Sequence, residues 1–162
     1  MADSEIPDTK SEEPELIASE VDELTHAELL CMYQDSEANI RFSKLLQWRI
    51  TGATLAVFAL VVLLAIDHRN QGTMARILII LTCAIATAAI SALAIFQSWQ
   101  GIERAKVRMA VGNLSSLARK IYTTKPRQAA NIERYILLFV MCSAILTAGF
   151  LVLSRLKGWF AV

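Results

Sequence analysis

The stretch Ile77–Phe96 reads ILIILTCAIATAAISALAIF, which is twenty consecutive residues without a charged side chain or a proline. Two further stretches, Ile50–Ile66 and Tyr135–Leu153, are similarly uncharged over 17 and 19 residues. At 1.5 Å per residue, helices of these lengths cover roughly 25–30 Å, which is close to the hydrocarbon thickness of a bilayer. A helix satisfies its own backbone hydrogen bonds inside lipid. The three stretches therefore predict an all-α integral membrane protein with three transmembrane helices.

The overall composition agrees with a membrane protein. The chain has 162 residues, of which 55% are hydrophobic, and a mean hydropathy of +0.45. This is more apolar than an ordinary soluble domain of the same size. The alternative is that the three stretches are buried core helices, but the remaining residues are too few to form a soluble shell around them. The predicted layout, in chain order, is a disordered acidic tail (1–20), a cytoplasmic juxtamembrane helix (21–48), a first span (49–66), a short external turn (67–76), a second span (77–96), a basic amphipathic cytoplasmic connection (97–134), a third span (135–154) and a short external tail (155–162).

The charges are distributed very unevenly along the chain. Residues 1–37 hold twelve acidic side chains and one lysine, whereas residues 38–162 hold fifteen basic and three acidic side chains. With three spans, eleven of the basic residues near the membrane fall on the side of the N-terminus and the connection, and four fall on the other side. Because basic residues accumulate on the cytoplasmic side, the N-terminus is predicted to be cytoplasmic and the C-terminus external, in a plasma or inner membrane.

The juxtamembrane segment is predicted to be helical. Thr25 and Glu28 have the spacing of a capping box, which predicts that the helix begins at Thr25. No helix-breaking residue follows before Trp48, so one helix is expected to run from Thr25 into the first span.

The connection 97–134 is predicted to contain an amphipathic helix. Gly112 should weaken this helix by roughly 1 kcal/mol relative to alanine, and Pro126 should end it. Thr124 is then expected to cap a new helix that leads into the third span. The expected apolar face consists of Ile102, Ala105, Met109, Leu117 and Ile121.

Small side chains recur at four-residue intervals inside the spans. In lipid there is little hydrophobic drive for helix association, so close approach of backbones at small residues supplies much of it. We expect these positions to form packing faces, either within one chain or between subunits, although Ala, Ser and Thr are also simply common in spanning helices. The predicted helix-packing residues are Gly52, Ala56, Ala84, Ala88, Ala92, Ser143 and Thr147.

Catalytic and metal chemistry have no clear signal in this sequence. The three uncharged stretches contain no Asp, Glu, Lys, Arg or His, which disfavours a proton-coupled transporter or a charged intramembrane catalytic group. Cys31, Cys83 and Cys142 lack the spacing of a thiol metal site, and His26 and His68 stand apart from other metal-ligand residues. We therefore expect no catalytic residues, no cofactor and no metal, and predict that the protein is not an enzyme.

The basic connection suggests contact with anionic lipid headgroups through Arg104, Arg108, Arg119 and Lys120. The alternative is that these charges only set the topology. No nucleic-acid-binding module accompanies them, so nucleic acid is not an expected partner. The acidic tail could also lie against this basic connection, since both are expected on the same side of the membrane.

The sequence therefore favours a small multi-pass membrane protein that acts by interaction, as an assembly factor or accessory subunit. The expected partners are the lipid bilayer and either a second copy of the chain or another membrane protein. The alternative is an oligomeric pore or membrane-perturbing effector, with a conduit lined by Thr82, Cys83, Thr87 and Ser91.

Overall fold

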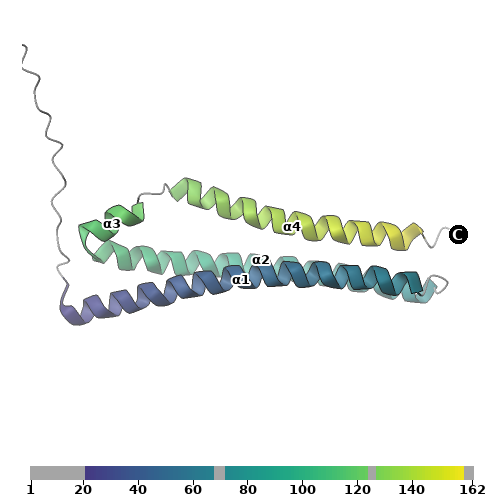
Figure 1. Cartoon of the computed structure of the whole chain (residues 1–162), viewed down its shortest axis with the longest axis horizontal. Helices are drawn as coiled ribbons and strands as arrows, with labels where there is room; N and C mark the ends of the chain where they lie inside the picture. The colour runs from purple at the N-terminus through teal and green to yellow at the C-terminus, as the bar shows by residue number, and fades with distance from the viewer. Residues whose placement is uncertain (1–20, 68–71, 124–126, 159–162) are drawn as a thin grey trace, which may run out of the picture.

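The computed structural model of the chain describes residues 21–67, 72–123 and 127–158, and these residues form four helices. Figure 1 shows α1 and α2 side by side along nearly their full length, with α4 beside them and the short α3 near one end. The predicted all-α class is confirmed, and three of the helices are long and apolar enough to cross a membrane. The helices are α1 (Glu23–Asp67), α2 (Gly72–Asn113), α3 (Ser116–Thr123) and α4 (Arg127–Gly158).

Some sequence predictions fall outside the described residues. These are the disordered acidic tail 1–20, the part of the external turn at 68–71 that includes His68, the cap and stop at 124–126, and the end of the external tail at 159–162. The structure does not test them.

Helix α1 begins earlier than the capping-box spacing predicted. The Asp22 side chain accepts hydrogen bonds from the Thr25 backbone N–H at 3.2 Å and from the Thr25 hydroxyl at 2.6 Å. Asp22 is therefore the N-cap and Thr25 occupies the third helical position, which corrects the prediction that Thr25 caps the helix. The hydrogen bonds from Thr25 hold the pKa of the Asp22 carboxyl below its ordinary value. A carboxylate at this end also interacts favourably with the helix dipole.

Helices α1 and α2 each continue well beyond their apolar stretches. One continuous helix leads into the first apolar stretch, as predicted, because α1 runs without interruption for 45 residues. Helix α2 has 42 residues and likewise extends past Phe96 to Asn113. Each helix is roughly 65 Å long, about twice the thickness of the hydrocarbon layer. The hairpin of α1 and α2 therefore consists of an apolar half and a second half that extends past the apolar stretches.

The connection is divided where Gly112 was predicted only to weaken a helix. Helix α2 ends one residue later, at Asn113, and the Asn113 side chain donates a hydrogen bond to the Met109 carbonyl at 2.9 Å. Helix α3 then begins at Ser116, and the Ser115 hydroxyl accepts a hydrogen bond from the Ala118 N–H at 3.4 Å. The connection is thus the end of α2, the separate helix α3 and the start of α4.

The face of the connection that packs on α1 also differs from the predicted apolar face. Among the five predicted residues, Ile102, Met109, Leu117 and Ile121 are exposed and Ala105 is only partly buried. The buried residues of this part of α2 are instead Gln100, Glu103, Val107, Ala110 and Val111. Apolar periodicity alone pointed to the wrong side of the helix, because two of the true packing residues are polar.

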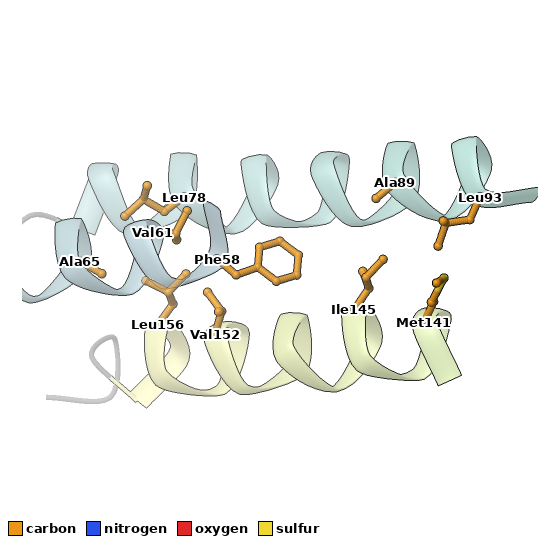
Figure 2. Close-up of a cluster of buried hydrophobic side chains, with 10 residues drawn as sticks. All are labelled: Phe58, Val61, Ala65, Leu78, Ala89, Leu93, Met141, Ile145, Val152 and Leu156. Carbon is orange, nitrogen blue, oxygen red and sulfur yellow. The ribbon is translucent and has the colours of Figure 1, made fainter. Parts of the chain in front are cut away.

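The apolar parts of α1, α2 and α4 enclose one hydrophobic core. Figure 2 shows Ala65, Leu78 and Leu156 together at one end of this core, and Leu93 and Met141 together at the other. Helix α4 is therefore antiparallel to α2 and parallel to α1, and the three apolar stretches lie at the same level. The remaining members of the core are Phe58, Val61, Ala89, Ile145 and Val152.

Candidate interaction surfaces

A buried polar seam joins α1 and α2 at and beyond the end of the apolar core. The Gln100 side-chain amide donates a hydrogen bond to the Gln47 side-chain oxygen at 2.9 Å, and the Gln47 amide in turn donates to the Leu93 carbonyl at 3.4 Å. The buried Ser43 hydroxyl donates to the Ile40 carbonyl at 3.0 Å. Gln47 and Gln100 are 4% and 2% exposed, so the amides are shielded from water by the two helices. Their hydrogen bonds satisfy groups that would otherwise be buried without partners.

Glu103 is the charged member of this seam. Its residue is only 3% exposed, and one carboxylate oxygen accepts a hydrogen bond from Lys106 at 2.8 Å. The hydrogen bond from Lys106 lowers the pKa of the Glu103 carboxyl, burial opposes this, and Ser36 and Trp99 add smaller lowering contributions, so the pKa lies below its ordinary value. Glu103 is therefore held in its ionised form inside the hairpin.

The buried residues of the seam recur along α1 at regular intervals. Along α1, Ser36, Ile40, Ser43 and Gln47 are separated by steps of four, three and four residues, and all four are buried. This is the spacing of a coiled-coil seam, in which a polar residue at a core position fixes register at a cost in stability. A search for seven-residue spacing that accepted Ser and Gln as core residues would have found it.

The predicted helix-packing residues lie mainly on the outside of the three-helix core. Gly52, Ala56, Ala84, Ala88 and Thr147 are exposed. Ala92 and Ser143 are partly buried. Packing within one chain therefore uses other residues, above all the larger members of the core. The alternative of packing between subunits is the one that these exposed positions leave open.

The four residues predicted to line a conduit do not share one surface of the chain. Thr82 is 1% exposed inside the core, and its hydroxyl donates to the Leu78 carbonyl at 2.7 Å. Cys83, Thr87 and Ser91 are exposed on the other side of α2. The Thr87 hydroxyl donates to its own helix as well, at the Cys83 carbonyl.

The four basic residues predicted to contact lipid headgroups are spread over two helices. Arg104 is partly buried on α2, and Arg108 is exposed. Arg119 and Lys120 are exposed on α3, where the Arg119 guanidinium donates a hydrogen bond to the Gly112 carbonyl at 2.8 Å. Arg119 thus holds the end of α2 against α3. Arg104 differs from the other three because it is partly buried.

Within residues 21–67, 72–123 and 127–158, no group of three or more His, Cys, Asp or Glu side chains is placed to hold a metal ion. The three cysteines are free thiols, with Cys31 and Cys83 exposed and Cys142 partly buried. Comparison with protein-family models, with curated proteins and with solved structures gives no match to this chain.

Proposed function

We propose that the chain is an integral membrane protein that associates with copies of itself and acts as an assembly or accessory subunit. The observation that carries this proposal is the presence of two strips of small side chains on the outside of the three-helix core. The α1 strip consists of Gly52, Ala56 and Ala59, and the α2 strip consists of Ala84, Thr87, Ala88 and Ser91; all of these residues are exposed.

The apolar exterior of the bundle supports insertion into a membrane. In the most apolar window of each long helix, only 28%, 22% and 22% of the residues are buried. A soluble bundle would bury such residues, whereas lipid accommodates them without cost. The extensions of α1 and α2 project from the same end of the core, and they carry basic residues with them. The preference of basic residues for the cytoplasm therefore favours a cytoplasmic position for these extensions.

The two strips have the composition that favours close helix packing in lipid. Leucine and phenylalanine side chains keep neighbouring helices apart, whereas glycine and alanine allow the backbones to approach and gain dispersion contacts. The core of the single chain does not use these strips, because it is built from other positions. A neighbouring copy would cover them.

The positions of the strips favour head-to-tail association. Each strip lies on the side of its helix that faces away from the other helix of the hairpin. Ala65 and Leu78 mark the same end of the core (Figure 2). Ala59 precedes Ala65 by six residues and Ala84 follows Leu78 by six, so the strips lie at the same depth. The α1 strip of one copy can therefore pack on the α2 strip of the next without a vertical shift, and such a contact generates a ring when it closes.

Disulfide cross-linking in native membranes tests this contact. The native Cys83 lies next to the α2 strip, and Ala59→Cys would place a thiol at about the same depth on the α1 strip. In a Cys31→Ser, Cys142→Ser background, mild oxidation of Ala59→Cys should give disulfide-linked dimers and larger species. Disulfide formation requires the two Cβ atoms to approach to about 4 Å, so the reaction reports a direct contact.

A matched control keeps the same depth and changes the helix. Leu151 is exposed on α4 and precedes Leu156 by five residues. Cys83 follows Leu78 by five residues, so the two positions lie at about the same depth. Leu151→Cys in the same background should give little cross-linking beyond random collision. Equal yields for Ala59→Cys and Leu151→Cys would show that the strips are not in contact and would refute self-association through them.

A further inference from the structure

Two arginines occupy facing positions on α2 and α4 just beyond the hydrophobic core. Leu93 and Met141 lie together at the end of this core (Figure 2). Arg104 follows Leu93 by eleven residues, which is three helical turns, and Arg134 precedes Met141 by seven residues, which is two turns. Both arginines therefore lie on the sides of their helices that face each other. Their Cα positions differ in height by roughly 6 Å, which two arginine side chains can bridge.

Two other arginines and one carboxylate act on the charge of Arg104. Arg104 is partly buried, and this burial lowers the pKa of its guanidinium. The positive charge of Arg134 lowers it further, and Arg108 acts in the same direction. Tyr122 and the carboxylate of Glu37 act in the opposite direction. Three guanidinium groups thus interact at this point with one carboxylate.

Arg134 has a buried hydrogen-bond donor. Its Nε atom is buried and has no hydrogen-bond partner among the described residues, while a terminal nitrogen donates to the Asn131 side chain. The guanidinium carbon lies 5.9 Å from the centre of the Tyr135 ring, which fixes its position at the start of the apolar stretch. A buried donor without a partner is costly, and an anion that accepts from it would remove that cost.

We propose that Arg104 and Arg134 form a binding site for a phosphate group at the junction of α2 and α4. The planar guanidinium offers paired donors that match two phosphate oxygens, and the positive charges of two such groups attract the anion. Arg134 immediately precedes the third apolar stretch, which is the depth of lipid headgroups in the proposed orientation. The favoured source of the phosphate is therefore an anionic phospholipid, with a soluble phosphate as the other source of the same chemistry.

This site goes beyond the predicted contact of the basic connection with lipid. Arg134 was not among the four predicted residues, and Arg119 is engaged with the Gly112 carbonyl. The site also requires no contact between copies of the chain. A negative result for the phosphate site would therefore not affect the proposed contact between copies. A negative cross-linking result would likewise not affect the phosphate site.

The test compares the full-length chain in nanodiscs of pure phosphatidylcholine with nanodiscs that contain phosphatidylglycerol. Thermal unfolding is followed for the wild type, for Arg104→Gln/Arg134→Gln and for the control Arg41→Gln/Arg76→Gln. The control removes the same charge from two exposed arginines. A ligand that binds only the folded state raises the midpoint, and we expect phosphatidylglycerol to raise it by about 2–4 °C or more in the wild type and the control. The Arg104→Gln/Arg134→Gln variant should lose this shift.

A second arm identifies the source of the phosphate. Inorganic phosphate is titrated against the protein in a neutral maltoside detergent, with sulfate-free buffer at constant ionic strength. A phosphate-dependent shift in the wild type that Arg104→Gln/Arg134→Gln abolishes assigns the site to soluble phosphate, whereas a shift confined to phosphatidylglycerol assigns it to the headgroup.

Relief of like-charge repulsion gives a third measurement. In the neutral maltoside detergent without added phosphate, Arg104→Gln/Arg134→Gln should unfold at the same temperature as the wild type or at a higher one, because an unoccupied pair of guanidinium groups repels. A lower midpoint there would mean that the arginines are structural, and it would overturn the proposal. So would a wild type that responds to neither probe, or a control pair that loses the response equally.

Discussion

Gln47 and Gln100 show how one hydrogen bond can fix the register of a long hairpin. A hydrogen bond between neutral groups contributes only about 0.5–1.5 kcal/mol to stability, but a buried amide left without a partner costs about 1–3 kcal/mol. Sliding α1 along α2 by one turn would separate the two amides and leave both buried. The pair therefore adds little to the stability of the correct register and penalises the incorrect ones.

A double-mutant cycle at this pair tests that interpretation. We expect Gln47→Leu and Gln100→Leu each to lower the free energy of unfolding by about 1–3 kcal/mol. Gln47→Leu leaves the buried Gln100 amide without its acceptor, and Gln100→Leu leaves the buried Gln47 side-chain oxygen without its donor. The variant with both changes should be close to the wild type or more stable. Thermal or denaturant unfolding in one detergent measures all four proteins, and additive losses in the double variant would contradict the expectation.

Glu103 makes the hairpin sensitive to acid. Its pKa is lowered in the folded chain, chiefly by the hydrogen bond from Lys106. A carboxyl with a lowered folded-state pKa stabilises the fold at pH values above its unfolded pKa, and this contribution is lost as the pH falls through the folded pKa. The loss therefore falls below about pH 4.3, the ordinary value for glutamate.

Hydrogen exchange of the extended part of α1 between pH 3 and pH 6, corrected for intrinsic exchange, measures this effect. Protection of residues 30–47 should fall on acidification in the wild type and should change less in Glu103→Gln, which has no carboxyl to titrate. Glu28 is an exposed carboxylate on α1, the helix whose exchange is measured. Glu28→Gln is therefore the matched control and should follow the wild type. A Glu103→Gln profile that is parallel to the wild type would show that Glu103 does not couple the hairpin to pH.

At the scale of elements, α4 packs closely against α1 at Gly149. A Cβ atom at this position would meet the Phe58 ring at 3.5 Å, which is an ordinary van der Waals contact. Alanine therefore fits without displacement, and it also removes the helix-interior penalty of glycine. A larger side chain would have to displace Phe58, which is 2% exposed in the core.

We therefore expect Gly149→Ala to retain or raise the unfolding midpoint, by up to about 1 kcal/mol in free energy. Gly149→Leu should lower the free energy of unfolding by about 1–3 kcal/mol through overpacking. Thr147→Leu places a leucine on the exposed side of the same helix and should have little effect. Thermal unfolding of the three variants in detergent decides this, and a destabilised Gly149→Ala would mean that the contact is tighter than 3.5 Å.

The elements differ in how far the sequence could predict them. Long uncharged stretches such as Ile77–Phe96 determine a helix on their own, because length and composition leave no other structure. The packing side of a helix depends on its neighbours, and a partner that supplies Gln47 and Ser36 can bury Gln100 and Glu103. Hydropathy therefore predicted the wrong packing face for the part of α2 that belongs to the connection 97–134.

The candidate sites could likewise be predicted only in part from the sequence. The basic composition of the connection was visible in the sequence and pointed to Arg104. The sequence did not indicate Arg134. Arg104 lies eleven residues after Leu93 and Arg134 lies seven residues before Met141, and nothing in the linear sequence relates these two positions. The two positions are related only through the antiparallel packing of α2 and α4, which places Leu93 beside Met141 (Figure 2).

At the scale of the whole molecule, the proposed orientation places the extended ends of α1 and α2 in the cytoplasm. Cys31 is exposed on the extension of α1, and Gly72 is exposed at the opposite end of the hairpin. In a Cys83→Ser, Cys142→Ser background, a membrane-impermeant maleimide should react with Cys31 only after the cells are permeabilised. With Gly72→Cys in a chain that also carries Cys31→Ser, the same reagent should label intact cells.

The reverse pattern of labelling would show that the orientation is opposite to the proposed one, still with three crossings. Labelling of both positions from the same side would be incompatible with a single span between them. Either result would also relocate the proposed phosphate site, since α1 and α4 begin at the same end of the bundle (Figure 1), and Cys31 and Arg134 lie near these starts.

The uninterrupted helix α1 has a mechanical consequence. Roughly 25 of its residues project beyond the apolar core, which corresponds to a lever of about 37 Å. Without a hinge between this lever and the first apolar stretch, rotation of the intramembrane part must carry the distal end with it. A tilt of ten degrees would sweep the Asp22 cap through about 6 Å. Changes in bilayer thickness or in the angle between neighbouring copies would thus be magnified at the tip of the hairpin.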